Sequence, residues 1–298
     1  MKYAFQTVDV FTDRKFGGNP LAVLTDARGL ATEQMQAIAA EFNYAETTFV
    51  LPPRDPVHTA EVRIFTPKAE MPFAGHPNVG TAYVLARAGA VLGKKIEGDQ
   101  LVFEEKAGLV PLTLTRAGGA VVSALLAAPQ PFKIVETVDA AIVAAASGLR
   151  PADIVGQPTV SSTGNNFLFA EVTSREALKR ATYNMETFRQ HLPMARTVGV
   201  HLYVAAKEHG VEIQSRMFAP LYGVPEDPAT GSANISLIGL LAHLDKRADL
   251  TLSKTIGQGF DMGRPSILEA AAEKKAGTVT ATYIGGKCVP MLTGEIEI

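Results

Sequence analysis

The chain has little of what marks secreted, membrane-spanning or nucleic-acid-binding proteins. Its 298 residues include one cysteine, Cys288, which excludes an internal disulfide and a cysteine-rich metal site. No apolar run approaches the ~20 residues of a membrane-spanning helix, and the N-terminal segment lacks the apolar stretch of a signal peptide. The net charge of −2 favours neither nucleic acid nor an anionic membrane. We therefore expect a cytoplasmic protein that acts on a small molecule, without a nucleic-acid or membrane partner.

One short phrase occurs twice, which predicts an internal duplication. Arg63-Ile64-Phe65-Thr66-Pro67 returns as Arg216-Met217-Phe218-Ala219-Pro220, 153 positions later. A second match follows 151 positions apart, between His76-Pro77-Asn78-Val79-Gly80-Thr81-Ala82 and Asp227-Pro228-Ala229-Thr230-Gly231-Ser232-Ala233. With 47% hydrophobic residues, the chain is large enough for two similar domains with cores of their own. This alignment makes His76 and Asp227 equivalent, and both would converge on one cleft if the halves face each other about a pseudo-twofold.

Hydrophobic periodicity predicts many short strands and a few helices. Helices are expected at Thr32–Phe42, with Thr32 as the N-cap, and at residues 77–87, 139–147, 176–181 and 228–242. The last of these is apolar on nearly every side and should be buried, with sheet around it. Two prolines in residues 127–132 mark the best linker. We therefore predict domains at residues 1–126 and 127–285.

The repeated helix starts suggest a binding site. His76 and Asp227 each precede a proline, so each is read as a cap in front of Pro at the first helical position. Gly80 and Gly231 would let a ligand or the other helix come close, and two helix N-termini would attract a small carboxylate. The plainer interpretation stays open: both dipeptides are common structural caps, and His76 alone could be a core imidazole.

At these positions the chain resembles the PhzF-like (phenazine biosynthesis-like) isomerase family, whose fold is related to that of diaminopimelate epimerase. The resemblance covers essentially the whole chain through a series of ordered motifs. These are Gly18-Asn19-Pro20, Ala45-Glu46-Thr47-Thr48-Phe49-Val50, Arg63–Pro67, Pro72-Phe73-Ala74-Gly75-His76-Pro77, Glu226–Ala233, Gly257-Gln258-Gly259 and Gly263-Arg264-Pro265-Ser266.

The resemblance implies an α+β fold of two pseudo-symmetric domains with the active site between them. Each domain would be a curved, mostly antiparallel β-sheet or barrel wrapped around a central α-helix. In related folds the C-terminal strand crosses back, so residues 286–298 are expected to join the N-terminal domain. The resemblance also implies a homodimer.

The implied activity is a cofactor-independent, metal-free isomerisation that moves a proton on a small anionic, cyclic amino or hydroxy acid. Glu46 would be the central acid/base, and the family's His and Asp map onto His76 and Asp227. The substrate-binding residues would be Asn19, Ser232 and the backbone amides of Gly75 and Gly231. The counterpart of Glu46 in the second half is Val200, so the chemistry would be asymmetric.

We also consider two functions other than a proton-moving isomerase. An amino-acid racemase or epimerase of the same fold would use one cysteine thiol at each helix start, whereas Cys288 lies near the C-terminus. A non-catalytic metabolite-binding protein would have kept the scaffold alone, against which the intact set of Glu46, His76, Asp227 and Ser232 argues. The substrate itself stays open, as do the direction and stereochemistry of the reaction and a role in phenazine synthesis.

Overall fold

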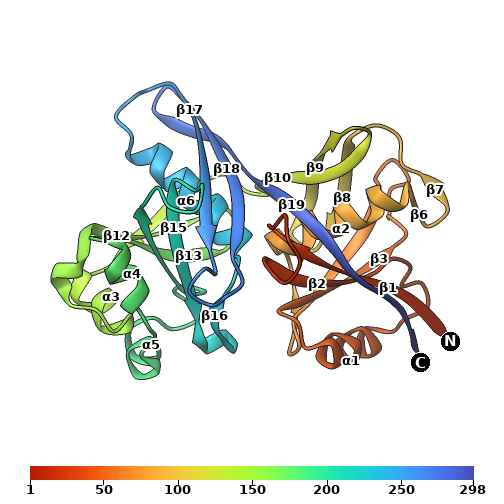
Figure 1. Cartoon of the computed structure of the whole chain (residues 1–298), viewed down its shortest axis with the longest axis horizontal. Helices are drawn as coiled ribbons and strands as arrows, with labels where there is room; N and C mark the ends of the chain where they lie inside the picture. Colours follow the sequence, from red (N-terminus) through yellow and green to blue (C-terminus); the bar gives the residue numbers. More distant parts are fainter. The chain divides into compact units, whose positions relative to one another are not determined.

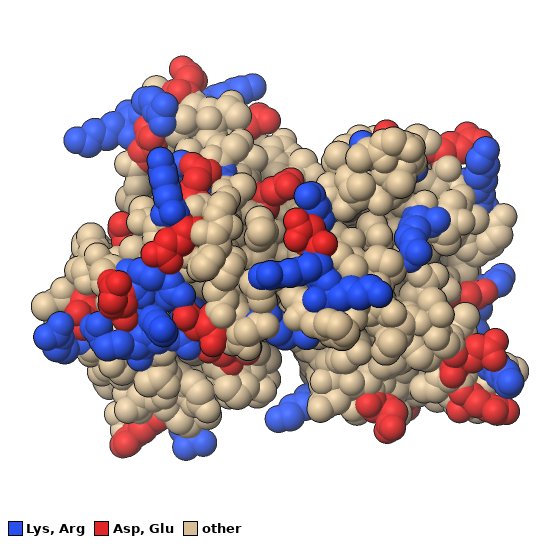
Figure 2. Space-filling view, viewed as in Figure 1, with Lys and Arg blue, Asp and Glu red and all other residues tan.

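The computed structural model describes residues 1–298, which divide into two compact domains. The N-terminal domain consists of residues 1–129 with 285–298, and the C-terminal domain of residues 130–284. Each is a curved sheet around one central helix (Figure 1), so the expected α+β fold is confirmed. No helix is both long enough and apolar enough to cross a membrane. On the face drawn in Figure 2, cationic and anionic side chains are interspersed.

Eight strands of the N-terminal domain form a sheet that closes on itself. In the order of their pairing they are β1 (Lys2–Val10), β2 (Asn19–Leu24), β3 (Glu46–Leu51), β4 (Ala60–Phe65), β8 (Gln100–Glu105), β9 (Gly108–Ala117), β10 (Ala120–Ala127) and β19 (Thr278–Glu297). The end of β19 pairs with β1, from Val10 opposite Cys288 to Lys2 opposite Glu297, and β19 also pairs with β10. The pairs β2–β3 and β4–β8 are parallel.

Helix α2 (Gly75–Ala88) fills this closed sheet. Every residue from Gly75 to Ala86 is buried, and the helix ends at Gly89 in the left-handed conformation, at φ 74°. Helix α1 (Thr32–Phe42) packs outside, with Met35, Ile38 and Ala39 buried. Its N-cap is Ala31 rather than the expected Thr32, whose hydroxyl instead accepts a hydrogen bond from Arg63. Three two-residue strands complete the domain: β5 (Glu70–Met71), β6 (Ala90–Val91) and β7 (Lys94–Lys95).

The C-terminal domain repeats the same order of strands. Its sheet runs through β11 (Lys133–Thr137), β12 (Ile154–Ser162), β13 (Asn166–Val172), β14 (Val200–Ala205), β15 (Ile213–Ala219), β17 (Leu250–Gln258), β18 (Ser266–Lys275) and the start of β19. As in the first domain, two pairs are parallel, β13–β14 and β15–β17. The central helix is α6 (Gly231–Leu244), whose residues are almost all buried.

Short helices cover the outer face of this second sheet. They are α3 (Ala140–Ala146), η1 (Pro151–Asp153), α4 (Arg175–Arg180), α5 (Met185–His191) and η2 (Pro220–Tyr222), and strand β16 (Val224–Asp227) leads towards α6. Val143, Leu178 and Phe188 from three of the helices pack against Leu168 and Leu202 of the sheet. The sequence did not predict β11, β12 or α5.

Gly80 serves packing and not the close approach of a ligand or another helix that the sequence suggested. A Cβ atom there would lie 2.6 Å from Leu21 Cδ2 and 2.7 Å from Val10 Cγ2. The absence of a side chain therefore lets α2 lie directly against β1 and β2.

Replacing Gly80 by Ala tests this assignment through the sign of the stability change. In an open helix position the change would stabilise by about 0.5–1 kcal/mol. Here we expect the free energy of unfolding to fall by about 1–3 kcal/mol, because the methyl group overpacks the interior. Urea unfolding measures the change in the free energy of unfolding. As a control, Ala88→Gly at the exposed end of the same helix measures the effect of intrinsic helix propensity without a change in packing. A stabilised Gly80→Ala protein would contradict the assignment.

Candidate active site

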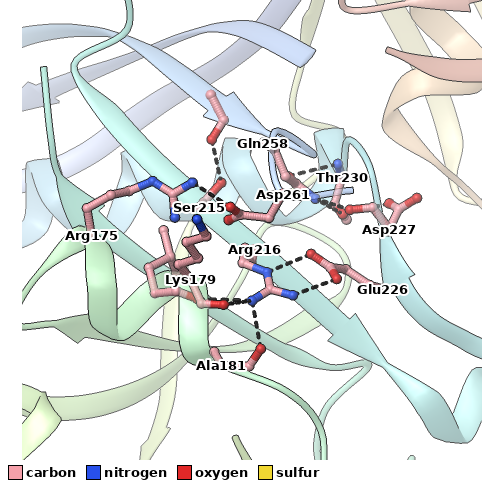
Figure 3. Close-up of polar contacts among 12 residues, drawn as sticks. Arg175, Lys179, Ala181, Ser215, Arg216, Glu226, Asp227, Thr230, Gln258 and Asp261 are labelled. Carbon is pink, nitrogen blue, oxygen red and sulfur yellow. Dashed lines mark hydrogen bonds and ion pairs between the residues drawn. The ribbon is translucent and has the colours of Figure 1, made fainter. Parts of the chain in front are cut away.

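The repeated Arg-x-Phe phrase forms the same structure in both domains. Arg63 donates two hydrogen bonds to Glu70, both at 2.8 Å, and Arg216 donates two to Glu226 at 2.7 and 2.8 Å (Figure 3). Each guanidinium also lies over the ring of the phenylalanine two residues later, 5.2 and 4.9 Å from its centroid. These bidentate pairs join β4 to β5 and β15 to β16, directly before each central helix.

The two glutamates reveal a repeat that corrects the alignment drawn from the sequence. Glu70-x-Pro-x-x-Gly75 and Glu226-x-Pro-x-x-Gly231 lie 156 positions apart, and each glycine is the first residue of its helix. Their longer spacing arises because η2 is inserted between Arg216 and Glu226. His76 is therefore equivalent to Ser232, not to Asp227.

The predicted caps are also wrong. The N-caps are Ala74 and Thr230, and His76 is the second residue of α2. An asparagine in the first turn binds the cap carbonyl instead: Asn78 Nδ2 donates to Ala74 O and Asn234 Nδ2 to Thr230 O, each at 3.0 Å. This matched pair supports the corrected alignment.

In the N-terminal domain the structure brings together the predicted Glu46, His76 and Asn19. Glu46 begins β3, its side chain is 18% exposed, and its Oε2 lies 3.4 Å from His76 Nδ1. Asn19, the first residue of β2, places its amide nitrogen 3.4 Å from the same Nδ1. Gly75 is adjacent to His76 at the start of α2. Two strands and the central helix thus contribute to one polar cluster.

His76 is uncharged in this arrangement. Burial lowers its pKa to about 3, and the backbone of Pro20 opposes that shift only weakly. Because a neutral imidazole carries one N–H, Nδ1 either donates to Glu46 or accepts from Asn19.

In the C-terminal domain Asp227 belongs to a hydrogen-bonded chain at the start of α6 (Figure 3). Gln258 Nε2 donates to Thr230 Oγ1 at 2.9 Å, and that hydroxyl donates to Asp227 Oδ2 at 2.6 Å. Gly231 and Ser232, the first two residues of α6, follow directly, and Ser232 is partly exposed. The predicted residues of this domain therefore also form one cluster.

Sequence reasoning missed the residues that hold these clusters. Gln258, Thr230 and Glu226 stand in motifs of the family resemblance without a role of their own, and Glu70 stands in none. The signal was present in the Glu-x-Pro-x-x-Gly repeat. In the whole chain, no three His, Cys, Asp or Glu side chains gather as metal ligands would.

Comparison with known proteins identifies the family. The model of the family described as phenazine biosynthesis-like protein matches residues 8–294. The chain belongs to this family. It is 37% identical to an uncharacterized isomerase from Mesorhizobium japonicum over 97% of both chains. It is 35% identical to trans-2,3-dihydro-3-hydroxyanthranilate isomerase from Pseudomonas chlororaphis over 98% of both. The expected enzyme class, an isomerase, is confirmed.

Solved structures agree with this assignment. The phenazine biosynthesis protein of the PhzF family from Bacillus anthracis superposes with a TM-score of 0.89, at 26% identity and full coverage of both chains. A probable proline racemase from Agrobacterium radiobacter, at 16% identity and a TM-score of 0.63 over 99% of this chain and 92% of its own, shares the fold alone.

The contribution of the two arginine–glutamate pairs to stability can be tested by replacing each arginine with lysine, which cannot form the two parallel hydrogen bonds. We expect Arg216→Lys to lower the free energy of unfolding by about 2–3 kcal/mol, because a lysine cannot bind Glu226 bidentately. Arg63→Lys should cost less, since only Arg216 also donates to three carbonyls, those of Leu178, Lys179 and Ala181. Urea unfolding gives both values. Arg247→Lys, in an exposed pair with Asp245, should change stability by under about 0.5 kcal/mol. Equal losses in all three variants would refute the special role of the two pairs.

The neutral state of His76 can be observed directly. In ¹⁵N spectra of the histidine rings, we expect the His76 signals to stay those of a neutral ring from pH 8 down to pH 5, because its folded pKa is about 3. The His76→Asn spectrum assigns the signals. Since an unfolded histidine binds a proton near pH 6.5, this residue adds stability above that pH that is lost as the pH falls towards 3. Titration of the His76 ring near pH 6.5 would contradict this assignment.

Proposed function

We propose that the chain is a cofactor-independent isomerase that moves a proton between two carbon atoms of a small cyclic acid, with Glu46 as the acid/base. The observation that carries the proposal is the 3.4 Å contact between Glu46 Oε2 and Nδ1 of the buried, neutral His76. A carboxylate beside a neutral imidazole can accept a proton and later return it.

The proton balance of such a step is simple. The Glu46 carboxylate takes a proton from one ring carbon, and the electron pair left behind is delocalised through the adjacent double bond towards the substrate's carboxylate. The Glu46 carboxyl, which is 18% exposed and can exchange its proton with solvent, then delivers a proton to another carbon. When Glu46 is ionised, His76 Nδ1–H can donate to it. Once Glu46 holds the proton, the imidazole can change tautomer and accept from Asn19.

The C-terminal cluster would bind the substrate's anionic end. Gly231 and Ser232 open helix α6, and the first N–H groups of a helix lack acceptors within it. Such a terminus favours a carboxylate. Asp227, held by the Thr230 hydroxyl, would hydrogen-bond an amino or hydroxyl group. This proposal takes from the family resemblance that the two clusters face one cleft.

The first substrate to test is trans-2,3-dihydro-3-hydroxyanthranilate, since it gives its name to an isomerase that is 35% identical over 98% of both chains. It is a small cyclic acid with an amino and a hydroxyl group. These are the groups that a carboxylate-binding helix start and a pair of acid/base residues would recognise.

A two-thiol racemase is the weaker candidate. Racemase and epimerase structures share the fold, at 16% and 12% identity. In this chain, however, His76 and Ser232 occupy the second positions of the central helices. The single thiol lies on β19 opposite Val10, where burial raises the pKa of Cys288 to about 12. A thiol that remains protonated near neutral pH cannot serve as the base.

Proton NMR in D₂O with the purified protein tests the proposal. We expect trans-2,3-dihydro-3-hydroxyanthranilate to be consumed with deuterium entering the ring. Glu46→Gln should lower the rate by a factor of about 10²–10⁴ or more, because the proton-transferring group is removed. Unchanged thermal unfolding would show that the fold is intact.

Glu41→Gln, at an exposed position of α1, is the matched control and should keep full activity. A fully active Glu46→Gln protein would sink the assignment of the base. An inert wild-type protein would remove this substrate, and a tightly bound metabolite that copurifies would then favour the non-catalytic alternative.

A further inference from the structure

Glu105 is a buried carboxyl group that the proposed reaction does not use. It is the last residue of β8 and is 4% exposed. It continues the inward row of Leu101 and Phe103, so its side chain points towards the central helix α2. Neither of its oxygens makes a hydrogen bond of normal geometry, although the amide of Asn78 lies close enough to oppose the rise of its pKa, and Asn78 Oδ1 has no partner. Buried oxygens without partners are costly, so this arrangement requires an explanation.

The register of the strands gives Glu105 a counterpart in the other domain. In the parallel pair β4–β8, Ala60 lies opposite Phe103. In the parallel pair β15–β17, Ile213 lies opposite Ile256, so both partners are displaced by 153 positions. The same displacement leads from Glu105 to Gln258. Both residues end their strands, and both lie beside the first-turn asparagine of the central helix.

Gln258 holds the start of α6 with both ends of its amide. Its Oε1 accepts from Asn234 Nδ2 at 2.8 Å and from the Thr230 backbone N–H at 3.1 Å. Its Nε2 donates to the backbone carbonyl of Asp227 at 2.8 Å. An acceptor and a donor on one planar group therefore secure the N-cap and the residue three positions before it (Figure 3).

We propose that Glu105 is held as a neutral carboxylic acid that does for α2 what Gln258 does for α6. A protonated carboxyl has the shape of an amide and offers the same pair of groups, one acceptor oxygen and one donor. Its carbonyl oxygen would face Asn78 Nδ2, and its O–H would donate to Asn78 Oδ1 or to the backbone carbonyl of Met71, which is 156 positions before Asp227 and so corresponds to the carbonyl that Gln258 binds. An ionised Glu105 would have no donor for any of these acceptors. Glu105 is thus a positioning residue for Gly75 and His76.

The surroundings of Glu105 favour the neutral form. Along β8, its neighbour Glu104 points away and is paired with Arg54 and His58, and Lys106 is paired with Glu70. Opposite Glu105, β9 contributes only Gly108.

No unpaired cation faces it from the other elements either. On β4 the inward row of Ala60, Val62 and Ile64 is apolar, while Arg63 is bound to Glu70. On α2 the titratable residues are His76, which is uncharged, and Tyr83, whose pKa burial raises, while the cationic Arg87 lies in the exposed last turn. Burial accordingly raises the pKa of Glu105 to about 8, against a small opposing effect of Asn78.

The protonation state can be measured without any assumption about the reaction. In protein labelled with ¹³C at the glutamate carboxyl carbon, the signal that disappears in Glu105→Gln identifies Glu105. We expect it to titrate with a midpoint near pH 8, and a midpoint in the range of the exposed glutamates would overturn the proposal. If Glu105→Gln does not fold, Glu105→Asp serves for assignment. The reciprocal Gln258→Glu protein should show a second carboxyl signal that titrates above neutral pH, and titration of that signal near 4.5 would argue against equivalent environments.

Stability provides an independent readout. The folded protein keeps the Glu105 proton to about pH 8, whereas an unfolded glutamate loses it near pH 4.5. The stability that this proton confers is therefore complete below pH 4.5 and is lost as the pH rises to about 8, by up to about tenfold in the unfolding constant for each pH unit. Relative to Glu105→Gln, the melting temperature of the wild type should fall between pH 5 and pH 8. Glu97→Gln, an exposed carboxylate of the same domain, should show no such trend. A constant difference between wild type and Glu105→Gln would contradict the proposal.

The consequence for catalysis rests on the proposed function. In the isomerase assay, activity of the wild type should decline above about pH 8, as Glu105 ionises and the start of α2 loosens, while Glu105→Gln keeps its activity there. Glu105→Leu, which fills the space without hydrogen bonds, should be impaired at every pH. An inert wild-type protein would refute the proposed substrate but leave the carboxyl titration and the stability trend to decide on Glu105.

Discussion

Each domain depends on burying a whole α-helix inside a curved sheet. Helix α2 is buried from Gly75 to Ala86, so the polar groups of its first turn cannot rely on solvent. Side chains of the helices themselves and of the surrounding sheet satisfy some of these groups. Asn78 and Asn234 bind the N-cap carbonyls, and Gln258 binds the Thr230 amide. The remaining N–H groups at the helix starts are those to which the proposed function assigns an anion.

The two domains share the interactions that support the central helix, but they differ in the side chains proposed to act on a substrate. The arginine–glutamate pairs, the first-turn asparagines and the parallel strand pairs recur in both domains. The groups that the proposed function makes reactive do not recur. Glu46 lies opposite Leu21 in the parallel pair β2–β3, and Val200 lies opposite Leu168 in the parallel pair β13–β14. Of these two corresponding residues, only Glu46 has an ionisable side chain. The domain with Glu46 thus carries an ionisable side chain at a position where the other domain carries an apolar one, which is the asymmetry that the proposed function uses.

Much of this architecture could be predicted from the sequence, because buried helices and alternating strands leave strong periodic signals. The helix at Thr32–Phe42 ends at Asn43, as its pattern indicated. Strand β11 was missed because Lys133–Thr137 is mostly exposed and lacks an apolar face. The alignment of His76 with Asp227 failed for a physical reason as well: the three-residue helix η2 shifts the spacing within the second copy. Sequence spacing alone could not show that the insertion precedes Glu226.

Buried polar residues were the hardest to predict, because a glutamate in a sequence looks like a surface residue wherever it falls. Glu104 and Glu105 are neighbours with opposite environments. The first binds Arg54 and His58, which hold its carboxyl ionised, and the second faces the interior without a cation. Consecutive residues of a strand point to opposite faces of the sheet, so the two side chains lie in different surroundings. The duplication places Gln258 at the position that corresponds to Glu105, and this suggests the role of Glu105. A neutral acid and an amide are interchangeable in shape and in hydrogen bonding. The domain that carries the acid is therefore the one whose helix start, with His76 on it, becomes sensitive to pH.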